Sequence, residues 1–380
     1  MIKERKKIIY YCTHSNLKDL SYGDSNNDNK FIISIPREFE VSRIFPERNE
    51  KGTVSLFSLL KVIIRLLMLS IKSNQKFVIR GTRVGIVPLF FKKLLKHIII
   101  LNLGCTPFST IERIAFSKNP SFQTKPNVFN KIRLKIEFQL EKLVLRNADI
   151  IYVENEKAKN LVNKYAKGEA TIIIIPYYVQ DYFLTTTELN YNIDDGKPLI
   201  IGYTGRFHKY DKLDPFIDAL KILKEKEFPF LIKLVGDGVT KKKIEEKARK
   251  LDLLDSVKFL GAQEHHEVSK IIDTEHMLIL PMVSNTCPST VPIKMLEGII
   301  KGKVILTNNS GNIKSLFKPY TELVLDDFSN PQMIAEQIIS IAQNYQKYAK
   351  FAEELRTRHL KARNSEFFRN KILKSLNHIK

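Results

Sequence analysis

Two short segments of this 380-residue sequence combine residue types that bind phosphates and hydroxyl groups. The first is Tyr203-Thr204-Gly205-Arg206, which ends an apolar run and is followed by Lys209 and Lys212. The second, residues 288–298, places serine and threonine before a helix-like run that contains Glu297. Guanidinium and ammonium groups neutralise phosphate oxygens, and the start of a helix is an anion site. These groups suit a ligand that carries phosphates and hydroxyls, which points to a sugar nucleotide.

Both segments belong to a repeating pattern of apolar strand, polar turn and amphipathic helix. In the second half this pattern predicts strands at Leu199–Tyr203, Leu231–Val235, Val257–Leu260, Met277–Leu280, Val304–Thr307 and Glu322–Leu325. In the first half it predicts strands at Lys7–Cys12, Phe31–Ser34, Phe77–Arg80, Ile98–Leu103, Ile150–Val153 and Thr171–Ile175. Strands that alternate with helices at this spacing form parallel sheets covered by helices. The sequence therefore predicts an α/β protein.

The periodicity fades between Pro176 and Pro198, which predicts a linker between two domains. We expect domains at 1–176 and 199–345, a linker at 177–198, and a helical segment at 346–380. Ligands of open parallel sheets bind outside the carboxyl ends of the strands. Both chemical segments are therefore expected at a cleft between the two domains.

The net charge of +21 is concentrated in one part of the first half. Between Glu50 and Glu112 the sequence holds ten lysines and arginines and no acidic residue. Its two apolar-basic runs, residues 54–69 and 89–96, are too interrupted or too short to span a bilayer, and they suit an anionic lipid surface. The alternative is a pair of buried domain helices with solvated charges. We favour that alternative for residues 54–69 and leave both interpretations open for residues 90–96.

Metal chemistry finds no support in the sequence. The three cysteines, Cys12, Cys105 and Cys287, are far apart and form no Cys-x-x-Cys pair, which is typical of reduced thiols in a cytosolic protein. An Asp-x-Asp motif does not occur. His14 follows the first predicted strand, where it could contact an acceptor or a donor sugar, whereas His265-His266 is interpreted as an exposed loop.

Five motifs in the second half occur in the order found in one enzyme family. They are Ile201-Gly202-Tyr203-Thr204-Gly205-Arg206-Phe207, Leu234-Val235-Gly236-Asp237-Gly238, Val257-Lys258-Phe259-Leu260-Gly261, Met277-Leu278-Ile279-Leu280-Pro281, and Pro292–Gly298 followed by Lys301–Ile305. On these residues the chain resembles the retaining enzymes of glycosyltransferase family 4, which have the GT-B fold. The resemblance covers residues 199–345, and the first domain matches mainly in its pattern.

The resemblance implies two Rossmann-like domains with a cleft between them and a C-terminal helix that packs back on the first domain. The first domain would bind the acceptor and the second the nucleotide-sugar donor. The implied reaction moves a sugar from a UDP or GDP donor to a saccharide or lipid-linked acceptor with retention. Because no Asp-x-Asp motif occurs, we expect the reaction to need no metal or other cofactor. The implied catalytic residues are Arg206 and Lys212, and the implied donor-binding residues are Gly205, Lys209, Ser289, Thr290, Ile293 and Glu297.

The donor helix departs from the family pattern at one position. The family has two glutamates separated by seven residues, and here Ser289 occupies the first position while Glu297 occupies the second. The family analogy assigns Glu297 to the ribose hydroxyls, and the alternative is an ion pair with Lys294 one turn earlier. Whether Lys209 or Lys212 contacts phosphate is left open.

The basic first domain indicates where such an enzyme would work. We expect a cytoplasmic protein at the inner face of a bacterial plasma membrane, in surface polysaccharide synthesis. It would dock on anionic lipid through Lys92, Lys93 and Lys96, with Phe90 and Phe91 in the interface. The rival interpretations are a GT-B-like sugar-nucleotide epimerase and a nucleic-acid-binding protein, although no nucleic-acid-binding motif accompanies the charge.

Overall fold

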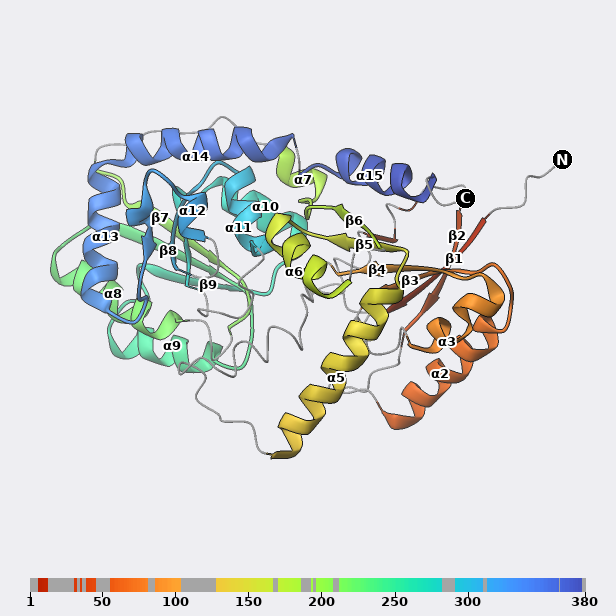
Figure 1. Ribbon diagram of the computed structural model, residues 1–380. Coiled ribbons are helices and arrows are strands. Elements are labelled where there is room, and N and C mark those ends of the chain that lie inside the picture. The colour runs from red at the N-terminus through yellow and green to blue at the C-terminus, as the bar shows by residue number, and fades with distance from the viewer. Residues whose placement is uncertain are drawn as a thin grey trace. The chain divides into compact units, whose positions relative to one another are not determined.

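The structure is a computed structural model, and Figure 1 shows its elements. It describes residues 6–12, 31–32, 35, 39–45, 55–80, 86–103, 128–166, 170–185, 193, 196–207, 212–281, 291–309, 313–361 and 363–377. The chain divides into two compact units. Unit 1 contains Met1–Tyr177 and Glu366–Lys380, and unit 2 contains Tyr178–Ser365.

Unit 1 is built on a parallel sheet of six strands in the order β2-β1-β3-β4-β5-β6. The strands are β1 (Lys6–Cys12), β2 (Phe39–Ile44), β3 (Lys76–Arg80), β4 (Ile98–Asn102), β5 (Ile150–Val153) and β6 (Thr171–Ile174). Five of them match the predicted strands. The predicted strand Phe31–Ser34 is wrong, because Phe31 and Ile32 are helical, and the edge strand is β2 instead.

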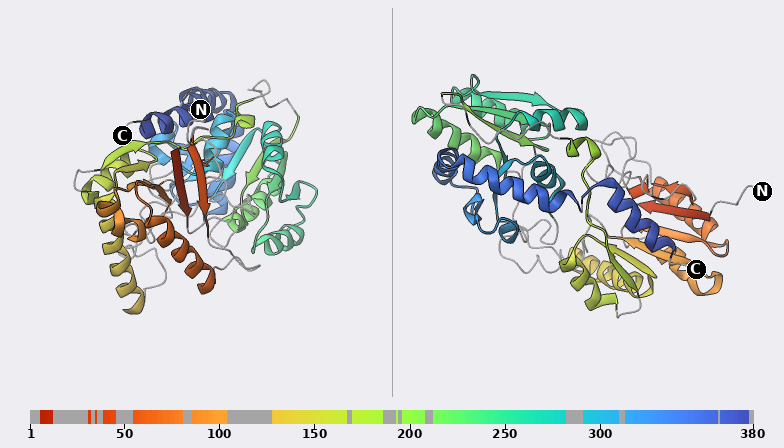
Figure 2. Two further views of the ribbon diagram at one scale, coloured as in Figure 1. Left: turned by 90° about the vertical axis from the view of Figure 1, so that its right-hand side faces the viewer. Right: turned by 90° about the horizontal axis from the view of Figure 1, so that it is seen from above.

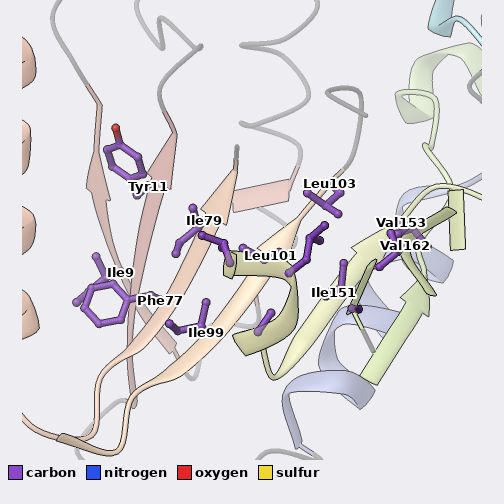
Figure 3. Packing of buried hydrophobic residues seen from close by; sticks show 14 of the residues in the cluster. Ile9, Tyr11, Phe77, Ile79, Ile99, Leu101, Leu103, Ile151, Val153 and Val162 are labelled. Atoms are coloured by element: carbon purple, nitrogen blue, oxygen red, sulfur yellow. The ribbon is translucent and has the colours of Figure 1, made fainter. Parts of the chain in front are cut away.

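Four helices supply the apolar side chains that cover one face of this sheet. They are α2 (Leu56–Ser70), α3 (Ile86–Leu95), α5 (Val128–Asn147) and α6 (Glu156–Ala166). Alternate strand residues such as Ile9, Phe77 and Ile99 point into the shared core, which is drawn in Figure 3. Continuous apolar strands of this kind are typical of parallel sheets buried on both faces.

The other face of the unit 1 sheet packs against α15 (Ser365–Asn377), as Figure 2 shows. The Tyr152 hydroxyl lies 2.7 Å from the Ser375 hydroxyl, and the Lys371 ammonium donates to the Ile174 carbonyl at 3.0 Å. The predicted return of a C-terminal helix to the first domain is therefore confirmed. The predicted single helical segment consists of two helices. The first, α14 (Tyr345–Leu360), belongs to unit 2, and the second, α15, belongs to unit 1.

Unit 2 has its own six-stranded parallel sheet in the order β12-β11-β10-β7-β8-β9. The strands are β7 (Leu199–Thr204), β8 (Phe230–Val235), β9 (Val257–Gly261), β10 (Met277–Leu280), β11 (Val304–Asn308) and β12 (Val324–Leu325). The helices are α7 (Asp181–Leu184), α8 (Leu213–Glu225), α9 (Lys241–Lys250), α10 (His265–Asp273), α11 (Ile293–Ile300), α12 (Ile313–Leu316) and α13 (Pro331–Gln343), and Thr321–Leu323 form a 3₁₀ turn. The strand order reverses between β7 and β10, and doubly wound sheets bind ligands at such a switch point.

Both sheets confirm the predicted α/β class with two parallel-sheet units. The strands predicted from Leu199 to Thr307 all occur within one or two residues of their expected ends. Among the residues that the structure describes, none of the helices has the length and apolar character needed to cross a membrane.

Candidate functional site

Glycines allow the turns after β7 and β8 to pack closely against each other. A Cβ on Gly236, which has a φ of +133°, would lie 1.8 Å from the Gly205 carbonyl oxygen. The Phe207 N–H donates to the Asp237 carbonyl at 2.9 Å, and the Gly205 N–H donates to the Val235 carbonyl at 3.1 Å. Only residues without a side chain permit this approach and this φ. The backbone on both sides of Arg206 is thereby held at the switch point.

Arg206 and Lys294 bring positive charge to this turn. The Arg206 side chain is exposed, while its carbonyl accepts a hydrogen bond of 2.8 Å from the Tyr203 hydroxyl. Lys294 lies in the first turn of α11, with its ammonium 5.2 Å from the centre of the Tyr203 ring. A Cβ on Gly205 would lie 3.3 Å from the same ammonium nitrogen. The helix places a second cation beside the predicted phosphate-binding turn.

Sequence reasoning treated Lys294 only as an alternative partner for Glu297. The position of Lys294 was itself a signal, because the helix dipole disfavours a cation in the first turn of a helix. An anion bound nearby would offset this unfavourable interaction. The structure gives Glu297 a different partner, described below.

Lys212 stands immediately before α8 and pairs with the loop after β12. Its ammonium donates to Asp327 at 2.8 Å and to the Ser329 hydroxyl at 2.7 Å, and the pairing lowers the pKa of Asp327. The predicted contact of Lys212 with phosphate stays a prediction. Ile293 begins α11 behind Pro292, as predicted. The predicted residues His14, Lys209, Ser289 and Thr290 lie outside the described residues.

Glu297 is a buried carboxylate on α11, with 4 % of its surface exposed. Its Oε1 lies 2.8 Å from Nε2 of His265, the first residue of α10. The interpretation of residues 265–266 as an exposed loop is therefore wrong, because both residues lie in α10 and His265 is half-buried, while only His266 is exposed. A buried carboxylate is costly without hydrogen bonds, and His265 Nε2 supplies one here.

The hydrogen-bonded chain continues from His265 to Tyr182 on α7. The Tyr182 hydroxyl lies 2.5 Å from His265 Nδ1. Burial and the negative charge of Glu297 raise the pKa of Tyr182 to about 12. The tyrosine therefore keeps its proton at neutral pH, and its hydroxyl can donate a hydrogen bond to the imidazole ring.

Further contacts tie together the three helices that carry these residues. The Lys301 ammonium at the end of α11 is buried, and it donates to Asp273 at 2.8 Å and to the Thr185 carbonyl at 2.9 Å. The Ser269 hydroxyl on α10 donates to the Tyr182 carbonyl at 3.0 Å. Helices α7, α10 and α11 therefore form one hydrogen-bonded group around Glu297.

Glu275 is a second buried carboxyl, and it lies at the opposite end of the sheet, just before β10. A Cβ on Gly202 would lie 2.0 Å from its Oε2, so the side chain lies across β7. Its carboxyl oxygens have no hydrogen-bond partner within the described part of the chain. Burial raises the pKa of Glu275 to about 8, and burial lowers that of the nearby Lys303 to about 8. This cluster bears on stability rather than on the site.

Unit 1 has a cavity of its own at the carboxyl ends of β3, β4 and β5. It is lined by Phe31, Arg80, Asn102, Tyr152, Val153, Ile175, Tyr177 and Phe368. Arg80 ends β3 and Asn102 ends β4, and both are buried. Sequence reasoning did not select them, although a polar residue that ends an apolar strand was a usable signal. The cavity presents a guanidinium and a carboxamide among aromatic rings.

Part of the chain is similar in sequence to known proteins. Residues 187–358 match the family model described as "Glycosyl transferases group 1". A "Putative glycosyltransferase EpsF" of Bacillus subtilis is 35% identical over 102 residues, which are 27% of this chain and 26% of that protein. An "Uncharacterized glycosyltransferase MJ1178" of Methanocaldococcus jannaschii is 25% identical over 203 residues, which are 53% of this chain and 52% of that protein. The matches thus span about a quarter and about half of these two relatives.

Solved structures resemble the chain over nearly its whole length. Sucrose-phosphate synthase of Thermosynechococcus elongatus has a TM-score of 0.71 at 12% identity, with 99% of each chain covered. HepE of Anabaena, solved with UDP and glucose, has a TM-score of 0.68 at 14% identity and covers 98% of this chain and 99% of its own. At such identities the likeness shows the fold, which is that of the GT-B enzymes.

Proposed function

We propose that the protein is a glycosyltransferase, because residues 187–358 match the family model described as "Glycosyl transferases group 1". It moves a sugar from a nucleotide-diphosphate donor to a saccharide or lipid-linked acceptor. The observation that carries the proposal is the arrangement at the switch point of unit 2, where Arg206 and Lys294 flank the glycine turn and Glu297 is buried on the adjoining helix.

The proposed donor is a UDP-sugar, with a GDP-sugar as the alternative. HepE, which shares the fold, has been solved with UDP and with UDP-glucose. When the bond from the sugar to the diphosphate breaks, negative charge grows on the phosphate oxygens. Preorganised cations stabilise that charge, and this effect is usually the largest single contribution to catalysis. Arg206, Lys294 and either Lys209 or Lys212 would supply it, together with the N–H groups at the start of α11.

The remaining predicted features belong to the same proposal. Glu297 would accept hydrogen bonds from the ribose hydroxyls, and Ser289 and Thr290 would lie at the donor sugar. Retention of the anomeric configuration and membership of glycosyltransferase family 4 follow from the resemblance of the motifs. We also propose that transfer needs no metal ion, because the phosphate charge is met by side chains and by helix α11.

The acceptor would bind in unit 1. It would bind outside the carboxyl ends of the unit 1 strands, where Arg80 ends β3 and Asn102 ends β4.

An exposed apolar-basic surface on unit 1 supports docking of the protein on an anionic membrane. On α2 the outer side chains Phe57, Leu60, Ile64, Leu67 and Met68 and the adjoining Ile71 are exposed, together with Lys61, Arg65 and Lys72. On the neighbouring α3, Phe90 and Leu94 are exposed together with Lys93 and Lys96. Exposed apolar groups of this extent mark interaction surfaces, and the basic residues favour anionic lipid.

This surface changes two details of the sequence prediction. The favoured interpretation of residues 54–69 as a buried helix is wrong for its outer side, which is apolar and exposed. Lys92 donates to Asp149 at 2.8 Å and to the Asn147 carbonyl at 2.5 Å, so its charge is engaged within unit 1. We therefore propose docking through α2 and α3 at the cytoplasmic face of the membrane, where a lipid-linked acceptor of surface polysaccharide synthesis is found.

The direct test is thermal stabilisation by nucleotides and sugar nucleotides in the presence of a metal chelator. A ligand at 100 times its Kd stabilises the folded state by about 2.7 kcal/mol. We expect UDP and one UDP-sugar to raise the melting temperature of the wild type, and Arg206→Ala to reduce the shift. The matched control is Lys258→Ala, an exposed cation on β9. If neither UDP, GDP nor any sugar nucleotide shifts the melting temperature, the proposal is wrong.

A further inference from the structure

We propose that His265 is a positioning residue that presents the Glu297 carboxylate to the ribose of the donor, and that Tyr182 fixes the His265 ring. The inference rests on the proposed function, because it concerns how the nucleotide is held. It adds two residues from helices α7 and α10 to a site otherwise built from α11 and the β7 turn.

The direction of each hydrogen bond follows from the chemistry of the groups. An ionised carboxylate only accepts, so His265 Nε2 must carry the proton that is shared with Glu297 Oε1 at 2.8 Å. In the neutral ring Nδ1 is then an acceptor, and the Tyr182 hydroxyl donates to it at 2.5 Å. Tyr182 therefore selects the tautomer that can bind Glu297.

The two carboxylate oxygens of Glu297 have different partners in this proposal. His265 occupies Oε1, so the carboxylate is held in one rotamer and Oε2 is assigned to the ligand. An unheld glutamate on a helix would lose rotamer freedom when ribose binds, and that loss would reduce the affinity. The histidine removes this cost before the nucleotide arrives.

The surroundings keep His265 in place. Its ring contacts Phe183, with the ring centres 5.1 Å apart, and a third of its side chain is exposed. The neighbouring His266 makes no contact of this kind, because it pairs with Glu267 at 3.0 Å on the surface of α10. His266 is therefore a matched control for a substitution at His265.

The alternative is that the three residues serve only to stabilise a buried carboxylate. The two roles differ in what they do to recognition of the ligand. A stabilising role changes the melting temperature and leaves the preference for ribose hydroxyls intact, whereas a positioning role changes that preference itself.

The experiment measures the Kd of UDP, 2′-deoxy-UDP and 3′-deoxy-UDP by calorimetry. The proteins are the wild type, His265→Leu, His265→Gln, Tyr182→Phe and the control His266→Leu. A hydrogen bond to a charged group is worth at least tenfold, so we expect the wild type to prefer UDP over at least one deoxy analogue by about tenfold. In His265→Leu the affinity for UDP should fall about tenfold, while the affinity for that analogue stays nearly unchanged.

The remaining variants sharpen the test. The amide of His265→Gln can still donate to Glu297, so most of the preference should return, and His266→Leu should behave as the wild type. Tyr182→Phe should lower the preference about threefold, and it provides the test if His265→Leu does not fold. Full preference for UDP in folded His265→Leu, or in Tyr182→Phe if that variant alone folds, would overturn the inference.

Two outcomes for the wild type separate this inference from the proposed function. Tight binding of UDP with no preference over either deoxy analogue overturns the positioning role and leaves the glycosyltransferase proposal standing. Failure of the wild type to bind any nucleotide overturns both.

Discussion

Replacing Glu275 by glutamine should stabilise the protein at pH 8 but not at pH 4.5. This carboxyl is buried across Gly202, and its two oxygens have no hydrogen-bond partner within the described part of the chain. Its pKa is about 8 in the folded protein, against a reference value of 4.5. Burial is the main cause, and the charges of Lys233 and Lys303 act in the opposite direction.

The sign follows from proton binding in the two states. Below pH 4.5 both folded and unfolded chains hold the proton, so the group has no effect. Between pH 4.5 and 8 the unfolded chain has lost the proton and the folded chain has kept it, so the stability falls as the pH rises. The rise in pKa from 4.5 to about 8 corresponds to a cost of about 5 kcal/mol at most.

Glutamine keeps the shape of the side chain and removes the ionisation. We expect a net gain of about 2 kcal/mol at pH 8, less than the maximum, because the buried amide of glutamine carries a desolvation cost of its own. For a unit of this size the gain corresponds to a rise in melting temperature of about 5 °C.

The assay is differential scanning calorimetry of the wild type and Glu275→Gln at pH 4.5, 6 and 8. Glu246→Gln, an exposed carboxylate on α9, is the control, and it should show no such trend. A difference in melting temperature that stays constant from pH 4.5 to 8, or a variant less stable than the wild type at pH 8, would refute the reasoning.

Three further predictions concern the site and the membrane surface. Arg206→Ala should lower the rate of sugar transfer about a hundredfold, as the loss of one preorganised charge contact does. Its melting temperature without ligand should stay within about 2 °C of the wild type's, because a surface substitution changes the stability little. Transfer at the wild-type rate would contradict the role of Arg206. Glu297→Ala should weaken UDP binding by about tenfold or more, and Ser289→Ala should weaken it less, because a charged acceptor contributes more than a neutral one; calorimetry that ranks them in the opposite order would contradict the ribose assignment. Met68→Glu combined with Phe90→Glu should abolish cosedimentation with anionic vesicles at low salt. The control Leu254→Glu, at an exposed apolar position in unit 2, should not. Unchanged sedimentation of the double variant would rule out docking through α2 and α3.

The sequence predicted those elements whose signal is local. Continuous apolar runs such as Ile8–Tyr11 and Met277–Leu280 are buried on both faces of a sheet, and they became β1 and β10. The edge strand β2 was missed because Glu40 and Arg43 interrupt its apolar residues. The run at Phe31 was misassigned because its apolar side chains fill the other face of the sheet, where Phe31 packs on Tyr10 and Tyr152.

The site was predicted only in part for a similar reason. Gly205, Arg206 and Glu297 belong to motifs within one turn or one helix, so their types and spacing could be read directly. His265 is 32 residues from its partner Glu297, and Tyr182 is 83 residues from its partner His265. No motif in the adjoining sequence distinguishes either residue. A hydrogen-bonded chain across three helices is visible only in the fold.

The placement of α15 has a consequence for how the protein folds during synthesis. Residues 366–377 complete unit 1, but the ribosome makes them after the whole of unit 2. Until then Phe368, Ile372 and Leu376 are missing from one face of the unit 1 sheet, and the apolar residues beneath them are uncovered. Unit 2 can fold as soon as its own residues leave the ribosome, whereas unit 1 cannot complete its fold until residues 366–377 are made. A nascent chain stalled before residue 366 would therefore expose an incomplete first unit to aggregation and to chaperones.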